Sequence, residues 1–316
     1  MAEGWLDSPQ PPGQADLAIL GFSDAVLQRF KRGGVRTVQQ LVVTHPLDVM
    51  DKCCLSWNTV CQAQAKAAER VAPEARTALA ILVEAVRFKT QIPALDRLLH
   101  GGLPCAVTEV VGPAGAGKTQ LCFTSAAAAT RAGVGEVVWI DSEGAFRPER
   151  LREVIQASRA AMGLDPAGFW EQLQRVRVVV GESLEDVHSH VQTVHNMTVG
   201  SVVLCIVDSV AAVARVVGEV AARQSQLNML ASRLKAVASR HGVPVLVTNQ
   251  IHGGPNSTDA ALGHVWHHAV NVRLRLDRGG RGERVLRVAK ASFAAAEVLE
   301  YEIGPAGVQP LALRAG

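Results

Sequence analysis

An eight-residue segment combines residue types and spacing that suit phosphate chemistry. Residues 112–119 read GPAGAGKT and match the pattern G-x-x-x-x-G-K-[ST] at every fixed position. Glycines at this spacing let backbone N–H groups converge on phosphate oxygens at the positive end of a helix. Lys118 would then reach the β- and γ-phosphates of a nucleotide, and the Thr119 hydroxyl would ligate Mg²⁺. A glycine-rich turn with a solvent-exposed lysine is the alternative, but the apolar run before the segment and the helical pattern after it favour a nucleotide site.

A phosphate-binding loop needs further carboxylates for the metal ion and for water, and two candidates follow apolar runs. Asp208 ends the run VVLCIVD, so it is predicted to lie at the carboxyl edge of a sheet and to ligate Mg²⁺ with Thr119. Glu143 follows the run VVWI and is the candidate that orients or deprotonates the attacking water. Taken alone, Asp208 could instead cap the next helical turn, and Glu143 could be a surface carboxylate.

Strand and helix patterns alternate from about residue 91 onward, and they must position these side chains. Near-continuous apolar runs are typical of strands buried on both faces, and they occupy residues 107–111, 137–140, 177–180, 202–208 and 243–249. Helical patterns separate them at residues 118–131, 147–162, 183–197 and 222–241. The alternation predicts an α/β fold, in which a mostly parallel sheet carries helices on both faces. Short strand patterns and a GGRG turn in residues 270–303 predict an antiparallel extension.

The rest of the chain predicts a second, smaller domain. Residues 1–14 contain three prolines and no periodicity, as in a flexible arm. Residues 15–73 carry short helical patterns and are predicted to form a small all-helical N-terminal domain. Residues 74–90 are the predicted linker, and residues 91–316 are the predicted core. A hydrophobic content of 48% over 316 residues excludes a disordered chain.

Composition also indicates the cellular compartment in which the protein is expected to work. None of the six Cys forms a C-x-x-C pair, which favours reduced thiols in the cytosol or nucleus. No apolar run approaches the roughly 18 residues that a bilayer-spanning helix needs. The first residues lack the basic and apolar regions of a secretory signal. We therefore expect no membrane partner.

Positive charge is concentrated in two C-terminal stretches, although the whole chain carries only +3. Between Arg215 and Arg240 five basic residues oppose one acidic residue, and between Arg273 and Lys290 seven oppose two. Such stretches are typical of a surface that binds a polyanion, although a solvated basic surface explains them equally well.

The motifs GPAGAGKTQL, IDSEGAFRPERL, VDSV and VLVTNQI, in this order and spacing, resemble those of the RecA-type recombinases of eukaryotes and archaea. The resemblance covers roughly residues 15–310. It implies a RecA-like P-loop ATPase core preceded by the small helical domain. The segment ALGHVWHHAVNVRL (261–274) is similar to the paralogue form of this family, and LSWNTVCQAQAKAAERVAPEARTA (55–78) looks most like the B-type paralogue, a partner of the C-, D- and X-type paralogues.

The resemblance implies roles for individual residues. Arg150 would stack on the adenine of ATP, and Gln250 would sense its γ-phosphate. His268 would contact ATP across a protomer interface. Lys118 and Glu143 would be catalytic in ATP hydrolysis, with Mg²⁺ as cofactor. The remaining ATP-binding residues would be those of the loop and its neighbour: Gly112, Pro113, Ala114, Gly115, Ala116, Gly117, Thr119 and Gln120.

Three histidines close together in the sequence admit another interpretation. His264, His267 and His268 could bind a metal ion, but they lack a fourth ligand and a strand–helix frame. A nucleotide contact by His268 is therefore the favoured prediction.

Two DNA-facing loops of the family would lie at about residues 213–222 and 251–264. Both look shorter than in the strand-exchange enzymes, which argues against an autonomous homology search. Arg215, Arg223 and Arg273 are the residues predicted to bind single-stranded DNA.

The predicted function follows from this resemblance. It is that of a weak, DNA-dependent ATPase in the nucleus, a recombinase paralogue for homologous recombination and double-strand break repair. Its expected nucleic-acid partner is single-stranded or branched DNA. Its expected protein partners are other paralogues, among which the C-type is favoured, and the main strand-exchange recombinase, which it assists in a hetero-complex. The alternatives are an autonomous recombinase with its own filament, a non-enzymatic assembly subunit that binds ATP structurally, and, more distantly, a hexameric helicase of the same ATPase fold.

The predicted linker bears on this choice. Strand-exchange members polymerise through a Phe-x-x-Ala element of their linker, whose Phe is a buried anchor. Here the only Phe of residues 74–90 is Phe88, and Gln91 stands where Ala is needed. The apolar stretch of residues 79–82, Leu-Ala-Ile-Leu, is the substitute, which either docks on a paralogue or packs against the chain's own core.

Overall fold

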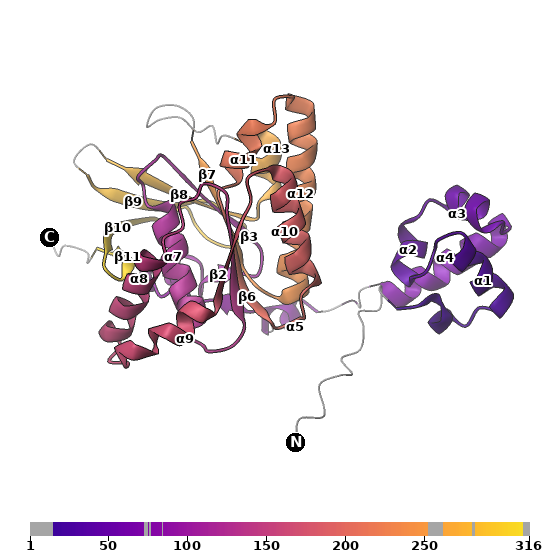
Figure 1. Ribbon diagram of the computed structural model, residues 1–316, viewed down its shortest axis with the longest axis horizontal. Coiled ribbons are helices and arrows are strands. Elements are labelled where there is room, and N and C mark those ends of the chain that lie inside the picture. The colour runs from indigo at the N-terminus through magenta and orange to yellow at the C-terminus, as the bar shows by residue number, and fades with distance from the viewer. Residues whose placement is uncertain are drawn as a thin grey trace, which may run out of the picture. The chain divides into compact units, whose positions relative to one another are not determined.

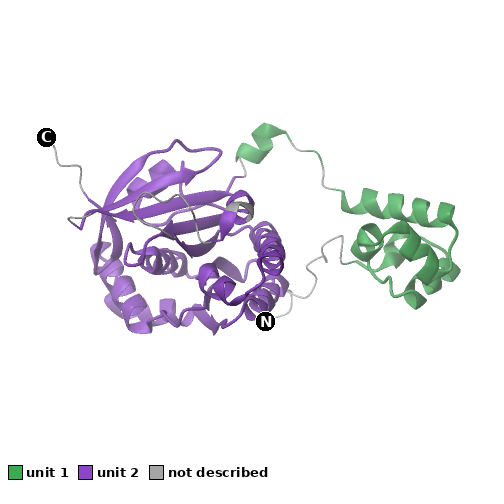
Figure 2. Ribbon diagram, turned by 90° about the horizontal axis from the view of Figure 1, so that it is seen from above, with its two compact units in different colours: residues 1–84 green, residues 85–316 purple. Residues whose placement is uncertain are grey.

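The computed structural model describes residues 15–72, 75, 77–83, 85–251, 262–279 and 282–311. The chain divides into two compact units, residues 1–84 and residues 85–316 (Figure 2). The predicted flexible arm and most of the predicted second DNA loop lie outside the described residues.

The described part of the first unit consists of helices. They are η1 (Leu17–Leu20), α1 (Asp24–Arg32), α2 (Val38–Val43), α3 (Pro46–Cys53), α4 (Trp57–Val71) and α5 (Ala78–Val83). A capping box of Thr37 and Gln40 begins α2, and the Ser56 side chain caps α4. The first five helices enclose a small core around Phe30 and Leu41.

A nine-stranded sheet forms the centre of the second unit (Figure 1). Its order is β11-β10-β9-β8-β3-β7-β6-β4-β5. The six strands from β8 to β5 pair in parallel, and β9, β10 and β11 extend the sheet as antiparallel strands. The strands are β3 (Val107–Gly112), β4 (Glu136–Asp141), β5 (Val176–Val180), β6 (Val202–Asp208), β7 (Val245–Gln250), β8 (Val272–Arg278), β9 (Arg284–Lys290), β10 (Val298–Gly304) and β11 (Gly307–Pro310).

Alternate residues of the central strands belong to two separate hydrophobic clusters, one on each face of the sheet. One face packs against α6 (Pro93–Leu98), α7 (Lys118–Thr130), α8 (Pro148–Ala161) and α9 (Phe169–Gln174). The other packs against α10 (Leu184–Asn196), α11 (Val210–Val216), α12 (Val220–His241) and α13 (Gly263–Ala269). The predicted fold class, a mostly parallel sheet with helices on both faces, is confirmed.

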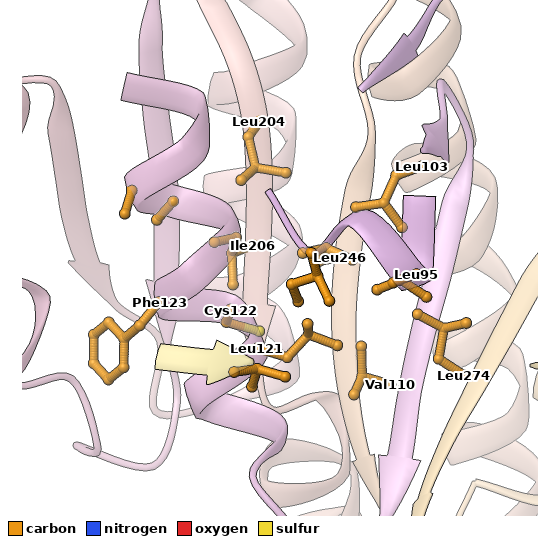
Figure 3. Packing of buried hydrophobic residues seen from close by; sticks show 14 of the residues in the cluster. Leu95, Leu103, Val110, Leu121, Cys122, Phe123, Leu204, Ile206, Leu246 and Leu274 are labelled. Atoms are coloured by element: carbon orange, nitrogen blue, oxygen red, sulfur yellow. The ribbon is translucent and has the colours of Figure 1, made fainter. Parts of the chain in front are cut away.

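Helix α7 is buried along most of its length, from Leu121 to Thr130. Figure 3 shows Leu121 and Cys122 of this helix beside Val110, Ile206 and Leu246 of the sheet. The helix that follows the phosphate loop is therefore fixed by apolar packing against three neighbouring strands.

Two features differ from the sequence prediction. Strand β5 was expected to be buried on both faces, but Val178 and Val180 are 39% and 61% exposed, because β5 is an edge strand with a single neighbour, β4. The predicted linker, residues 74–90, carries no strong pattern in the sequence, but it contains α5 and β1 (Arg87–Phe88), which pairs with β2 (Leu103–Pro104).

Within the described ranges, no helix has the length and apolar character that crossing a bilayer requires. The same part of the chain contains no group of three His, Cys, Asp or Glu side chains arranged to hold a metal ion. All six cysteines are free thiols.

Candidate functional site

The phosphate loop, residues 112–119, connects β3 to α7 at the carboxyl edge of the sheet. Gly115 and Gly117 have φ angles of 74° and 109°, in the left-handed region that residues with a Cβ rarely adopt. A Cβ on Gly117 would in addition lie only 2.8 Å from Cδ1 of Ile303. The motif therefore needs glycine at position 117 both for its backbone conformation and for the close approach of β10.

Lys118 lies in the first turn of α7 and faces back into the loop. Its ammonium donates hydrogen bonds of 2.9 Å to the backbone carbonyls of Gly112 and Pro113. Burial lowers the pKa of Lys118, while the nearby Asp208 and Glu143 carboxylates partly offset this effect. The ammonium is thus held where phosphate oxygens can replace the carbonyl oxygens as its partners.

Tyr301, on β10, supports the loop, although sequence reasoning did not identify it. Its hydroxyl donates a 2.5 Å hydrogen bond to the carbonyl of Ala116, a residue 185 positions earlier in the chain. Burial raises the pKa of Tyr301, so the phenol remains a neutral donor. The sequence held one signal, because this is the only tyrosine of the chain and it lies in an alternating strand pattern.

Asp208, the last residue of β6, is a buried carboxylate with one unused oxygen. The Thr248 hydroxyl donates to Oδ1, whereas Oδ2 accepts no hydrogen bond from any residue that the structure describes. Burial raises the pKa of Asp208, and the hydroxyls of Thr248 and Thr119 beside it act in the opposite direction. A buried carboxylate oxygen next to a threonine hydroxyl suits a hard cation with oxygen ligands, so the residues present fit Mg²⁺.

Glu143 is exposed and lies in the turn after β4. Its Oε1 accepts hydrogen bonds from the Ser209 hydroxyl at 2.5 Å and from Nε2 of Gln250 at 3.3 Å. The Asp141 carboxylate fixes the turn, because it accepts backbone N–H groups of residues 143, 145 and 146 at 3.0 to 3.2 Å. Sequence reasoning found Glu143 and Gln250 but missed the supporting roles of Asp141 and Ser209.

The structure brings most of the predicted nucleotide residues together around one pocket of about 310 Å³. Predicted residues that line it are Ala114, Gly115, Gly117, Lys118, Thr119, Gln120, Glu143, Asp208 and Gln250. Ser209, Thr248 and Ile303 also line it and had no predicted role. A positively charged loop, a buried carboxylate for a metal ion and an exposed carboxylate therefore share one cavity, which is the set that phosphoryl transfer needs.

Arg150 and His268 lie outside the lining of this pocket. Nε of Arg150 donates to Oε1 of Gln120 at 2.8 Å, and its guanidinium also donates to the carbonyl of Gly304 at 2.7 Å. These bonds hold Arg150 next to a residue that lines the pocket. His268 is exposed on α13. Contacts of either side chain with ATP stay predictions.

Two of the three arginines predicted to bind DNA are accessible. Arg215 is exposed in the last turn of α11, and Arg223 is half-buried in the first turn of α12. Only residues 217–219 connect these two helices. Most of the predicted first DNA loop, residues 213–222, is therefore helical, and the two side chains flank the short connection that remains.

The prediction that Arg273 contacts DNA does not fit the structure. The Arg273 side chain, on β8, is only 6% exposed and forms an ion pair with the fully buried Glu109 of β3. Its charge is neutralised inside the protein and is not available to a phosphate backbone.

The sequence of the chain matches those of several known proteins. The sequence model of the Rad51 family matches residues 82–311. Human DNA repair protein RAD51 homolog 2 is 28% identical, over 94% of this chain and 89% of the relative. DNA repair and recombination protein RadA of Metallosphaera sedula is 27% identical, over 92% of this chain and 94% of the relative. The meiotic recombination protein DMC1 homolog of Glycine max is 33% identical, over 71% of this chain and 68% of the relative. The resemblance to RecA-type recombinases, and to their B-type paralogue, is confirmed.

Nucleotide affinity should depend on the Lys118 ammonium. Lys118→Ala removes the charge that faces the loop, so the Kd for ATP, measured by calorimetry, should rise at least about tenfold. Lys89→Ala is the matched control, because Lys89 is exposed and does not line the pocket. An unchanged Kd in Lys118→Ala would contradict the assignment of this loop as the phosphate site.

Proposed function

The chain belongs to the Rad51 family, and from this premise we propose that it is an ATP-dependent, DNA-binding recombinase paralogue. It acts in homologous recombination and double-strand break repair, in the nucleus, and assists the main strand-exchange recombinase within a hetero-complex. The observation that carries the proposal is the pocket around Lys118, Asp208 and Glu143. Relatives named for DNA repair and for meiotic recombination support the biological role.

The first task of the pocket is to hold the nucleotide. Backbone N–H groups of the loop and the N-terminal end of α7 bind phosphate oxygens, and Lys118 contributes a full positive charge. Gln120, fixed by its bond to Arg150, extends the pocket beyond the phosphates. The left-handed conformations of Gly115 and Gly117 give the loop the shape in which its N–H groups converge on phosphate oxygens.

The second task is to activate water near the terminal phosphate. Glu143 orients or deprotonates this water, and its two donors, Ser209 and Gln250, keep the carboxylate turned into the pocket. Thr119 and Asp208 would hold Mg²⁺, which neutralises charge on the phosphates when it is bound.

Turnover should depend on Glu143 more strongly than binding does. Glu143→Gln keeps the shape of the side chain but removes the base, so kcat for ATP should fall about 10²-fold while the Kd for ATP changes little. Glu149→Gln, at an exposed position of α8, should change neither quantity. Equal losses of binding and turnover in Glu143→Gln would mean that Glu143 only stabilises the turn.

Single-stranded DNA is the proposed ligand of the surface around residues 217–219. Replacing Arg215 and Arg223 by alanine should weaken binding and lower the slope of log K against log salt by about one unit for each arginine that neutralises a phosphate. Arg240→Ala is the matched control, because Arg240 lies on the same helix as Arg223, about 25 Å further along. Equal effects of the three substitutions would point to non-specific attraction by the net charge of the chain.

Assembly with a paralogue, of which the C-type is the proposed partner, is supported by the stretch around α5. Leu79, Ile81 and Leu82 are exposed on this helix, which is the kind of apolar patch that an interface covers. Phe88, in contrast, is half-buried in β1 and packs against the core of its own unit, so it is not available as an anchor for a neighbouring copy.

The isolated chain should not form long helical filaments with ATP and single-stranded DNA, and electron microscopy tests this. The double variant Leu79→Ser/Leu82→Ser should lose co-purification with the C-type paralogue, because it removes two apolar anchors. Val43→Ser is the control, since Val43 is equally exposed elsewhere in the first unit. Regular filaments of the wild-type chain alone would favour the autonomous recombinase instead.

A further inference from the structure

Behind the nucleotide pocket, a fully buried carboxylate joins three strands and α13. Glu109 lies in the middle of β3 and has no exposed surface. Its Oε2 accepts a 2.5 Å hydrogen bond from Nε of Arg273 on β8. Its Oε1 accepts hydrogen bonds from Nδ2 of Asn249 on β7, at 2.6 Å, and from the indole Nε1 of Trp266 on α13, at 3.0 Å.

This cluster is unusual because all of its members are buried. Asn249 and Trp266 have no exposed surface, and Arg273 is also buried. A carboxylate inside a core is stable only when its charge is paired and its oxygens accept hydrogen bonds, and both conditions hold for Glu109. None of the nucleotide chemistry described above involves Glu109 directly, so its presence in the core calls for a separate explanation.

Asn249 connects this cluster to the pocket. Its Nδ2 donates to Glu109, and its Oδ1 accepts the backbone N–H of Gln250 at 2.8 Å. Because one end of the amide meets an acceptor and the other end meets a donor, only one orientation of the amide satisfies both. Gln250 then donates through Nε2 to Glu143. A continuous series of hydrogen bonds therefore runs from Arg273 through Glu109, Asn249 and Gln250 to Glu143.

We propose that Glu109 is a positioning residue of the nucleotide pocket, which acts through Asn249 to fix the Gln250 side chain against Glu143. Gln250 and Glu143 line the pocket together with the phosphate loop, where the terminal phosphate distinguishes ATP from ADP. Fixing Gln250 therefore sharpens the preference for the triphosphate. The inference rests on the proposed function of the pocket as an ATP site, but it requires neither DNA binding nor a hetero-complex.

Trp266 provides a matched comparison within the same cluster. It donates to the same oxygen of Glu109 as Asn249 does, but its bond leads to α13 and not to Gln250. Removing either donor costs Glu109 one hydrogen bond from an uncharged donor and should lower stability by a similar amount. Only the loss of Asn249 should change how the pocket binds the nucleotide, because only Asn249 bonds to Gln250.

The experiment measures the Kd for ADP and for a non-hydrolysable ATP analogue in the full-length chain by calorimetry, together with the thermal midpoint. In Asn249→Leu the preference for the ATP analogue over ADP, expressed as the ratio of the two Kd values, should fall about 3- to 10-fold, with the Kd for ADP nearly unchanged. In Trp266→Phe the thermal midpoint should fall but the ratio should stay at the wild-type value. If Asn249→Leu does not fold, Asn249→Ala, which adds no bulk, provides the same comparison.

Two outcomes would overturn the proposal. One is an unchanged ratio in the Asn249 variant, and the other is an equal fall of the ratio in both variants, which would make the cluster purely structural. Absence of DNA binding or of turnover in the wild-type chain would count against the proposed function without changing this ratio, so the two failures are distinguishable.

Discussion

Four parallel strands, β3, β7, β6 and β4, end at the same edge of the sheet, because helices return the chain to the opposite edge after each strand. Their register sets which residues meet there. Gly112 is the Cα partner of Gln250, and Asp141 is the Cα partner of Asp208. A slip of one residue in any of these pairs would turn the side chains to the other face of the sheet and dismantle the pocket. Apolar packing on both faces holds this register, so the chemistry of the site depends on the two hydrophobic cores.

Residues at strand ends could be placed from the sequence for this reason. The apolar runs located strands β3 to β7 to within two residues, and polar side chains at the end of a run had to lie at the carboxyl edge. The predicted antiparallel extension, residues 270–303, was only partly right, because β8 pairs in parallel with β3 and β11 lies beyond residue 303. Asp208 and Glu143 were found in this way, the glycine-rich pattern located the loop, and the family resemblance implied the role of Gln250. At these positions the local sequence pattern and the position of the strand in the sheet lead to the same placement of the side chain, so the sequence alone suffices to predict it.

Residues whose roles depend on distant pairing could not be found in this way. Arg273 was counted among the basic residues of a C-terminal stretch, and only the pairing of β8 with β3 places it opposite Glu109. A signal was present, because Glu109 interrupts an apolar strand and a buried carboxylate requires a cation. Asp141 and Ser209 act through a turn and a neighbouring strand end, whose geometry periodicity does not encode. Strand β5 was predicted to be buried because its run of valines resembles those of central strands. Its position at the edge of the sheet follows only from the strand order, which periodicity does not encode.

The position of Tyr301 has a practical consequence for spectroscopy. Because the chain contains a single tyrosine, biosynthetic incorporation of 3-fluorotyrosine would introduce one fluorine nucleus, on a ring whose hydroxyl is bonded to the Ala116 carbonyl of the phosphate loop. Its ¹⁹F resonance would be free of overlap and would come from a buried ring, where shifts respond strongly to small changes of nearby dipoles. The fold thus carries a natural labelling site for observing the loop in solution, and no engineered residue is required.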